Sequence, residues 1–191
     1  MNMQRLLCAA ASLTLLIGGV ARAGDTYKVD PVHATAAFKI KHANVANFYG
    51  RINAPEGTIV VDEADSTKTT FDIQLKAANI DSGNPKRDDH LKSPDFFSAQ
   101  EFPTISFKST SVKKTGDNKL EVTGDMTMHG QTKPVTVTLE QGGPSDVPRM
   151  GKRAGFSGEF TVKRSDFGMT KFTEVLGDEV TIMLGLEGAK Q

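Results

Sequence analysis

The sequence predicts an all-β domain in which about eight antiparallel strands close into an up-and-down barrel, with one or two short helices. Apolar and polar residues alternate with a period of two almost everywhere after Tyr27, as in strands with one buried and one exposed face. The turns between these segments are short, so neighbouring strands are expected to be antiparallel. Closure into a barrel removes the exposed edges of such a meander. A sandwich of two sheets is the alternative architecture.

The alternation locates individual strands. The segment 70–76 alternates Phe, Ile and Leu with Asp, Gln and Lys. The same period continues through 119–129, 135–139, 156–162 and 180–186. Because successive side chains of a strand point to opposite faces, the apolar residues of each segment are expected to point into the barrel.

Short turn motifs connect these strands. His129-Gly130 fits a two-residue hairpin between 125–128 and 131–139, and residues 115–118 turn the preceding strand into the next one. The glycine-containing and proline-containing segment 142–155 is expected to be a long loop.

Two glycines, Gly124 and Gly158, lie at inward-facing positions of the alternation. An inward glycine lets a strand bend sharply or leaves room for another group to approach the backbone. Both readings are compatible with a barrel, and bending is the simpler of the two.

One segment interrupts the period of two. Asn84 is a suitable N-cap with Pro85 at the first helical position, and the helix must end before Pro94. Ser93-Pro94 repeats this start signal, so a second short helical turn is expected over 93–97. The apolar residues of this segment are expected to plug or line one end of the barrel. They are Leu91, Phe96 and Phe97.

The first 23 residues predict an exported protein. A positively charged start precedes an apolar run over 6–20, and Ala21-Arg22-Ala23 matches a signal-peptidase site, so residues 1–23 are expected to be a cleaved signal peptide. A retained membrane anchor is the alternative, but the run is shorter than the ~20 residues that a spanning helix needs. Cys8 lies too early in the run for a lipoprotein cysteine. We therefore expect a periplasmic protein.

The mature chain, residues 24–191, is long enough for one domain with a substantial core. Its charges are 23 − 2 = 21 basic and 23 acidic side chains, because the removed segment holds Arg5 and Arg22 and no acid. A net charge of 21 − 23 = −2 does not favour a nucleic-acid partner. The single cysteine leaves with the signal peptide, so no disulfide, thiol nucleophile or thiolate ligand is expected.

Five motifs extend over nearly the whole mature chain: YKVD at 27–30, RDDHLKSPDFF at 87–97, FPTISF at 102–107, GDMTMHGQTKPV at 124–135 and GKRAGF at 151–156. Together they resemble the YceI-like proteins, also called polyisoprenoid-binding periplasmic proteins. The resemblance implies a lipocalin-like, eight-stranded antiparallel barrel whose apolar cavity holds an isoprenoid lipid such as a polyprenyl phosphate or an isoprenoid quinone. It implies a binding or transport role. One departure is the hairpin tip, often Asn-Gly in this family and His129-Gly130 here.

The predicted cavity lining is aromatic and methionine-rich, and methionine provides a flexible, polarizable surface for an irregular chain. For each phenylalanine, plain core packing is the alternative. The lining residues are predicted to be Phe38, Phe48, Phe71, Phe96, Phe97, Phe107, Met126, Met128, Phe156 and Phe160.

Two basic clusters could bind a polar head group at the cavity mouth. The predicted rim is Arg149, Lys152 and Arg153, and a second cluster at Lys86, Arg87 and Lys92 flanks the short helix. The alternatives are solvated loops and, for Arg87 with Asp88 and Asp89, pairing or capping of the helix.

Catalysis is not expected. The histidines do not have the close spacing of a zinc site, since the nearest pair, His33 and His42, are nine residues apart, and no Gly-x-Ser-x-Gly turn occurs. We therefore expect no catalytic residues, no metal and no cofactor. The predicted partners are an isoprenoid lipid and, transiently, the inner membrane, with a monomer and a homodimer both open. The alternative function is a periplasmic stress-response interaction protein without a dedicated small ligand.

Overall fold

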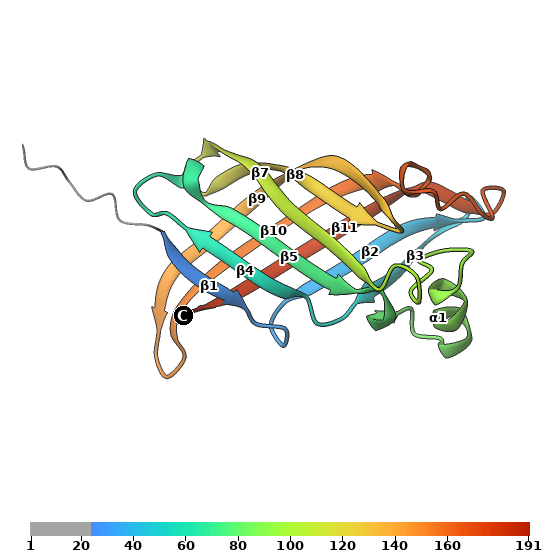
Figure 1. Ribbon diagram of the computed structural model, residues 1–191, viewed down its shortest axis with the longest axis horizontal. Helices are drawn as coiled ribbons and strands as arrows, with labels where there is room; N and C mark the ends of the chain where they lie inside the picture. The colour runs from blue at the N-terminus through green and yellow to red at the C-terminus, as the bar shows by residue number, and fades with distance from the viewer. Residues whose placement is uncertain (1–23) are drawn as a thin grey trace, which may run out of the picture.

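The structure, a computed structural model, describes residues 24–191, which form a closed antiparallel barrel of eight strands with one short α-helix at one end (Figure 1). The strands are β1 (Asp25–Val29), β2 (Thr35–His42), β3 (Ala46–Ile52), β4 (Glu56–Val61), β5 (Thr70–Lys76), β6 (Ile80–Asp81), β7 (Thr104–Gly116), β8 (Lys119–Met128), β9 (Gln131–Val147), β10 (Gly151–Lys163) and β11 (Leu176–Lys190). The predicted signal peptide, residues 1–23, lies outside the described residues. No described helix is long and apolar enough to cross a bilayer.

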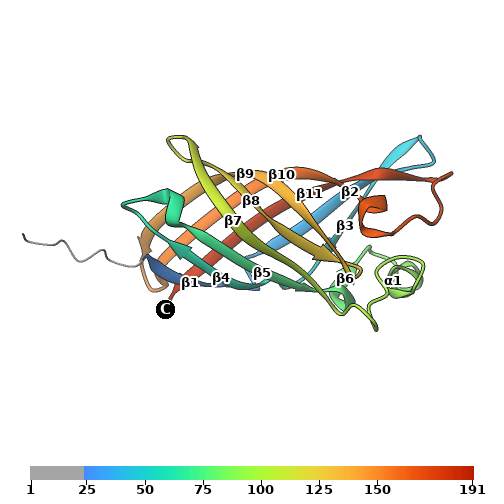
Figure 2. The ribbon, with the colours of Figure 1, turned by 45° about the horizontal axis from the view of Figure 1, so that its top comes forward.

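The eleven strand segments make an eight-stranded ring because the first three long strands are each interrupted. β1 pairs with residues 188–190 of β11, and β2 continues along the same strand from Gly185 to Leu176. β1 and β2 thus form one strand of the ring. β3 and β4 together form the next strand, and β5 and β6 form the one after that. The pairing of β1 with β11 closes the ring (Figure 2), which confirms the predicted barrel and excludes the sandwich.

The hairpin tips follow the predicted turn chemistry in two places. His129 and Gly130 both have positive φ, 51° and 72°, as a type I′ turn requires, and Met128 pairs with Gln131. At the β7–β8 turn Gly116 pairs with Lys119.

The predicted long loop over 142–155 is wrong. β9 and β10 remain paired to Val147 and Gly151, and Gly142 lies opposite Gly155 in the ladder. Glycine and proline weaken a strand locally, but here the two halves of the segment pair with each other as a hairpin, and β11 pairs with the β10 half from Arg153 on.

The inward glycines do not open space for a ligand. A Cβ on Gly124 would lie 2.5 Å from the ring of Phe107, and one on Gly158 would lie 2.5 Å from the carbonyl oxygen of Thr138. Each glycine is therefore a point of close packing, where a neighbouring group occupies the position that a side chain would need.

The predicted helix is α1 (Pro85–Lys92), capped by the side chain of Asn84, which accepts a hydrogen bond from the Arg87 amide at 3.1 Å. The second predicted helical turn is wrong. Residues 93–97 form turns in which the Ser93 carbonyl accepts from the amides of Phe96 and Ser98. These turns fold Phe96 back into the barrel, where it is buried. Three short 3-10 helices complete the described chain: η1 (Ser66–Lys68), η2 (Ala77–Asn79) and η3 (Arg164–Phe167).

The interior consists of two apolar clusters stacked along the barrel axis. One includes Tyr27, Ile59, Phe71 and Phe156 and fills the half of the barrel that holds β1 and the C-terminus. The other includes Ile105, Met126, Met128 and Phe167 and lies toward α1. The two halves therefore differ, because residues of the second cluster line a cavity and none of the buried residues of the first cluster does.

Candidate ligand-binding cavity

A cavity of about 370 Å³ occupies the half of the barrel beside α1. This volume lies within the range of small-molecule pockets, roughly 300–1,000 Å³. Its lining residues come from the strand walls, α1 and the loop before β11: Ala36, Ala37, Phe38, Ile40, His42, Phe48, Ile52, Leu75, Arg87, His90, Leu91, Phe96, Phe97, Ile105, Met126, Met128, Val162, Arg164, Met169, Phe172, Val175, Leu176, Val180 and Ile182.

Strand alternation explains the apolar wall. On β2 the inward positions are Ala36, Phe38 and Ile40, and the ring of Phe38 lies against Gly50 of the neighbouring β3. Since Gly50 has no side chain, the Phe38 ring can lie flat against the wall. The absence of a Cβ at this one position thus leaves room inside the cavity.

The inner end of the cavity is formed by Met126, Met128, Ile105 and Val162, which belong to the apolar cluster on the α1 side. Their flexible and branched side chains present hydrocarbon and thioether surface. A ligand chain that reaches this end is enclosed by apolar groups.

Six of the ten predicted lining residues lie on the cavity wall: Phe38, Phe48, Phe96, Phe97, Met126 and Met128. Phe71 and Phe156 instead pack edge to face in the other half of the barrel, with ring centroids 4.9 Å apart. Phe107 and Phe160 pack between the two clusters and do not line the cavity. Periodicity identifies an inward side chain but not its depth along the barrel axis, and depth decides whether a side chain meets the cavity or the packed core.

The cavity mouth carries an aromatic cluster that joins α1 to the loop before β11. The imidazole of His90 meets the rings of Phe96 and Phe172 edge to face at 5.1 and 5.5 Å. Phe96 and Phe172 are stacked, with centroids 5.7 Å apart. The His90 Nε2 atom lies 3.1 Å from an oxygen of Asp95. The cluster places apolar faces toward the cavity and polar atoms toward solvent.

Arg87 is the cation at this mouth. Its Nε donates to the Ser82 hydroxyl at 2.9 Å and its Nη2 to the Ser82 carbonyl at 2.7 Å. The guanidinium lies 4.3 Å from the centre of the Phe48 ring. Asp88 accepts from the Ser82 amide, so Ser82 ties both Arg87 and Asp88 to the barrel. Arg87 therefore has a structural role, but its side chain bonds to Ser82 and not to Asp88 or Asp89 as the sequence suggested, and it also lines the cavity.

Arg164 is a lining residue that sequence reasoning missed. Its side chain is 3% exposed and donates to four backbone carbonyls, those of Met169, Lys171, Leu176 and Gly177, at 2.7 to 3.2 Å. Burial lowers the pKa of this guanidinium. The signal in the sequence was its phase, since 164 continues the inward series of 160 and 162. An arginine at an inward position indicates a buried polar network.

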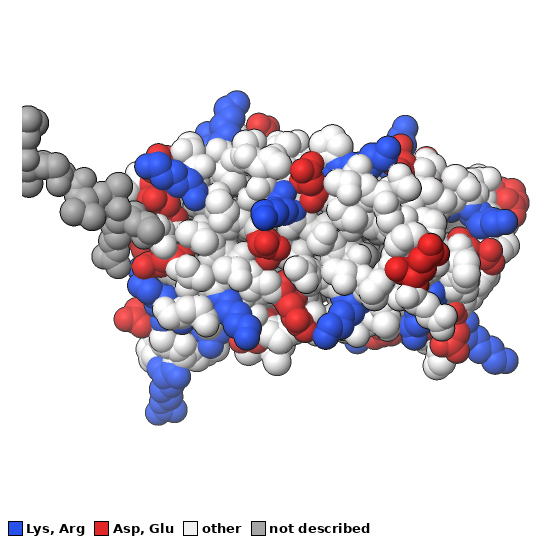
Figure 3. Space-filling model, viewed as in Figure 1, with Lys and Arg blue, Asp and Glu red and all other residues white. Residues whose placement is uncertain are grey.

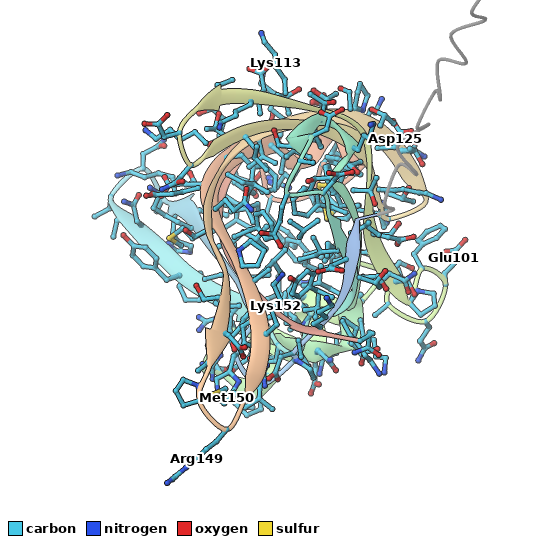
Figure 4. All side chains as sticks on the ribbon, turned by 90° about the vertical axis from the view of Figure 1, so that its left-hand side faces the viewer. Glu101, Lys113, Asp125, Arg149, Met150 and Lys152 are labelled. Carbon is cyan, nitrogen blue, oxygen red and sulfur yellow. The ribbon has the colours of Figure 1, made fainter. Side chains whose placement is uncertain are left out.

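The predicted rim residues Arg149, Lys152 and Arg153 lie at the opposite end of the barrel, on the β9–β10 hairpin (Figure 4). Arg149 projects from the hairpin tip. Lys152 pairs with Glu63 at 2.6 Å and with Asp25 at 3.3 Å, and the hydrogen bond to Glu63 raises the pKa of Lys152 to about 12. These residues do not line the cavity. The sequence placed them in a loop, whereas the long β9–β10 hairpin carries them away from α1.

A second charged cluster lies in the loop after β1. Asp30, His33 and Glu187 bring their ligand atoms within 4.8 Å of one another. Arg153 lies 3.1 Å from Asp30 and 3.4 Å from Glu187, so a guanidinium already pairs with both carboxylates. The cluster is an ion-pair network that ties β10 to the β1–β2 loop.

The electrostatic character of the cavity is set by few groups. Among the lining residues the polar side chains are His42, Arg87, His90 and Arg164, and none of the described lining residues is an aspartate or glutamate. On the face of the barrel seen in Figure 3, acidic and basic residues are interspersed. The cavity can therefore enclose a long apolar group and present hydrogen-bond donors at its mouth, where a polar acceptor would remain near water.

Comparison with known proteins places this architecture in a family. The YceI-like domain family matches residues 27–188. A UPF0312 protein of Pseudomonas aeruginosa (strain LESB58) is 37% identical over 188 residues, covering 97% of each chain. The protein YceI of Escherichia coli O157:H7 is 34% identical over 191 residues, covering 99% of this chain and all of that one.

Solved structures have the same barrel. BcnA of Burkholderia cenocepacia superposes with a TM-score of 0.75 at 25% identity, covering 83% of this chain and 98% of its own. A polyisoprenoid binding domain from Saccharophagus degradans, implicated in plant cell wall breakdown, has a TM-score of 0.70 at 12% identity, covering 86% and 98%. At this identity the second likeness concerns the fold. The family match and the curated relatives show that the chain belongs to the YceI-like domain family.

Proposed function

We propose that this protein is a non-catalytic binding and carrier protein of the periplasm, which holds the tail of an isoprenoid lipid in the barrel cavity. The observation that carries the proposal is the cavity itself, whose wall is almost entirely apolar and whose mouth bears Arg87 and His90. The Saccharophagus degradans neighbour, described as a polyisoprenoid binding domain, has the same fold and supports the same ligand class.

The geometry suggests one orientation of the ligand. The tail would extend toward Met126 and Met128 at the inner end, and the head would stay beside Arg87 at the mouth. The head could be a phosphate or a quinone, because both offer oxygen acceptors to a guanidinium.

The energetics make the head group important. Burial of one isoprene unit yields roughly 3 kcal/mol, at about 0.8 kcal/mol per methylene equivalent. A bilayer buries the same tail equally well, so tail burial alone does not favour transfer from membrane to protein. Contacts with the head group at the mouth must therefore supply the free energy that favours transfer to the protein.

Native mass spectrometry with lipid extraction tests the proposal. The sample is the chain that begins at Gly24, purified from the exported pool without detergent; all barrel strands lie within 25–190, so this product retains the whole barrel. One co-purifying prenyl lipid near one-to-one is the expected result. An empty protein that also refuses added prenyl lipids would contradict it and favour an interaction protein without a small ligand.

A cavity-filling variant gives a matched control for this measurement. Ala36 is a small inward residue on β2 that lines the cavity, whereas its neighbour Lys39 lies outside the lining. Ala36→Phe is expected to reduce lipid occupancy, and Lys39→Gln is expected to leave it unchanged. Equal occupancy in both variants would place the lipid elsewhere.

A further inference from the structure

We propose that the protein docks on a lipid bilayer through an apolar surface around the cavity mouth, the mouth surface, formed by Val45, Phe172 and Val175. This proposal rests on the proposed function, because a prenyl lipid resides in a bilayer before it enters the cavity. It adds the surface through which protein and membrane would meet.

The mouth surface is continuous with the cavity. Phe172 and Val175 line the cavity and are also 37% and 40% exposed at the protein surface. Val45, at the tip of the β2–β3 hairpin, is 82% exposed. The Ala43 amide donates to the Val175 carbonyl at 2.6 Å, so the hairpin and the loop before β11 form one surface at the α1 end (Figure 2). Phe172 and Val175 thus link the solvent-exposed surface to the cavity, and the backbone bond holds the tip that carries Val45 beside them.

The backbone of the mouth surface is held in unfavourable conformations. Phe172 has φ 57°, and Ala43 and Asn44 in the hairpin tip have φ 50° and 55°. Side chains with a Cβ rarely adopt this left-handed region, and a bulky aromatic residue there is an outlier. The surrounding bonds impose it, since the Phe172 carbonyl accepts from Val175 and Leu176 and Arg164 Nη1 donates to the Lys171 carbonyl. The fold therefore maintains a strained backbone at the positions where apolar side chains are exposed at the mouth.

A bilayer fits this surface better than a charged partner does. The neighbouring charges are mixed, with exposed Lys41 and Lys171 against exposed Glu174, so they do not form a field of one sign. Apolar insertion into the interfacial layer would then dominate. Contact at the mouth lets a prenyl tail pass from acyl chains into the cavity without crossing water, which avoids the cost of hydrating it.

The experiment compares two equally exposed valines on the chain that begins at Gly24. Val45 belongs to the mouth surface but does not line the cavity, whereas Val32 is also 82% exposed and lies in the β1–β2 loop beside Asp30. Vesicle flotation with phosphatidylcholine is expected to be about tenfold weaker for Val45→Asp than for the wild type and unchanged for Val32→Asp. Transfer of a fluorescent prenyl probe between vesicles is expected to slow in parallel, with little dependence on salt.

A second readout reports the orientation. The only cysteine of the sequence is Cys8, so the chain from Gly24 accepts a single engineered cysteine for an environment-sensitive dye. A dye on Asn44→Cys is expected to shift to the blue on vesicles, and a dye on Val32→Cys is expected not to shift.

The outcomes separate the two proposals. Equal flotation of Val45→Asp and wild type, or equal dye shifts at positions 44 and 32, would overturn docking through the mouth surface. A change of oligomeric state in Val45→Asp without a change in flotation would overturn it in favour of a second copy of the chain. Failure to bind a soluble prenyl probe, with the flotation difference intact, would overturn the proposed ligand and leave the docking surface in place.

Discussion

The guanidinium of Arg87 lies 4.3 Å from the centre of the Phe48 ring, and this contact joins α1 to β3 at the mouth of the cavity. Two further bonds from Arg87 reach Ser82 at the base of the helix. No hydrogen bond between described residues occupies Nη1 of Arg87, which leaves this atom able to donate to a ligand. Arg87 is thus the group best placed to distinguish head groups.

Arg87→Gln is expected to abolish head-group preference. A charge-assisted hydrogen bond is worth about 1.5–3 kcal/mol, so the wild type should bind farnesyl phosphate roughly tenfold or more tightly than farnesol. The variant should bind the two about equally, with farnesol affinity little changed. Competition binding measures both ligands.

Lys86→Gln is the matched control, because Lys86 lies on the same helix and does not line the cavity. This variant should keep the wild-type preference. A wild type without preference, or a Lys86 variant that behaves like the Arg87 variant, would contradict a specific role for Arg87.

Gly50→Ala is expected to reduce ligand capacity by moving Phe38. The new Cβ would collide with the Phe38 ring, which must then turn toward the cavity. Overpacking of this kind typically costs about 1–3 kcal/mol of stability. Prenyl-probe titration and urea unfolding check both effects. Gly185→Ala on β11 is the control, since nothing lies within 4 Å of its added Cβ, and equal behaviour of the two variants would refute the steric argument.

Arg164→Met is expected to destabilise the fold and loosen the loop before β11. The substitution leaves four backbone carbonyls without their donor, and leaving a buried acceptor unsatisfied costs about 1–3 kcal/mol. Urea unfolding measures the loss, and hydrogen exchange should show it concentrated in residues 169–177. Lys163→Met, at an exposed neighbouring position, should stay near the wild type. A loss below about 1 kcal/mol would show that water replaces the guanidinium easily.

The Asp30–His33 pair is expected to contribute most to the free energy of unfolding at weakly acidic pH. Hydrogen bonds from His33 and the Val32 amide lower the pKa of Asp30 from 3.8 to about 2, and Asp30 raises the pKa of His33 above 6.5. The Asp30 contribution is therefore present above pH 3.8 and is lost as the pH falls toward 2. The His33 contribution is present below pH 6.5 and is lost as the pH rises through its higher folded value.

Asp30→Asn should accordingly be less stable than the wild type between pH 4 and 6.5, with a smaller loss below pH 4. Urea unfolding across this range measures the difference. Asp117→Asn, in the exposed β7–β8 turn, serves as the comparison. A profile for Asp30→Asn parallel to that of the wild type would show that the pair is not coupled to folding.

The accuracy of the sequence predictions varied with the kind of information each required. The strand at 70–76 and the His129-Gly130 turn were predicted correctly because alternation and turn chemistry are local. The loop over 142–155 was predicted wrongly, because its glycines and proline favour a loop locally, whereas β9 and β10 stay paired up to Val147 and Gly151 and the distant β11 pairs with β10 from Arg153 on. Phe71 and Phe38 both occupy inward positions of the alternation, yet Phe71 packs in the apolar cluster away from α1 and Phe38 lines the cavity.

The sequence by itself determined that the chain is an all-β meander with inward-facing phenylalanine and methionine and one capped helix, because period and capping are read from neighbouring residues. Only the tertiary structure decided where the cavity lies. Closure pairs β1 with β11. Apolar side chains then pack in one half of the barrel, and the cavity lies in the other half, beside α1. The same closure places Arg87 and Arg164 at the cavity and carries Arg149, Lys152 and Arg153 to the far end. Position along the barrel axis depends on register between distant strands, and no local pattern records it.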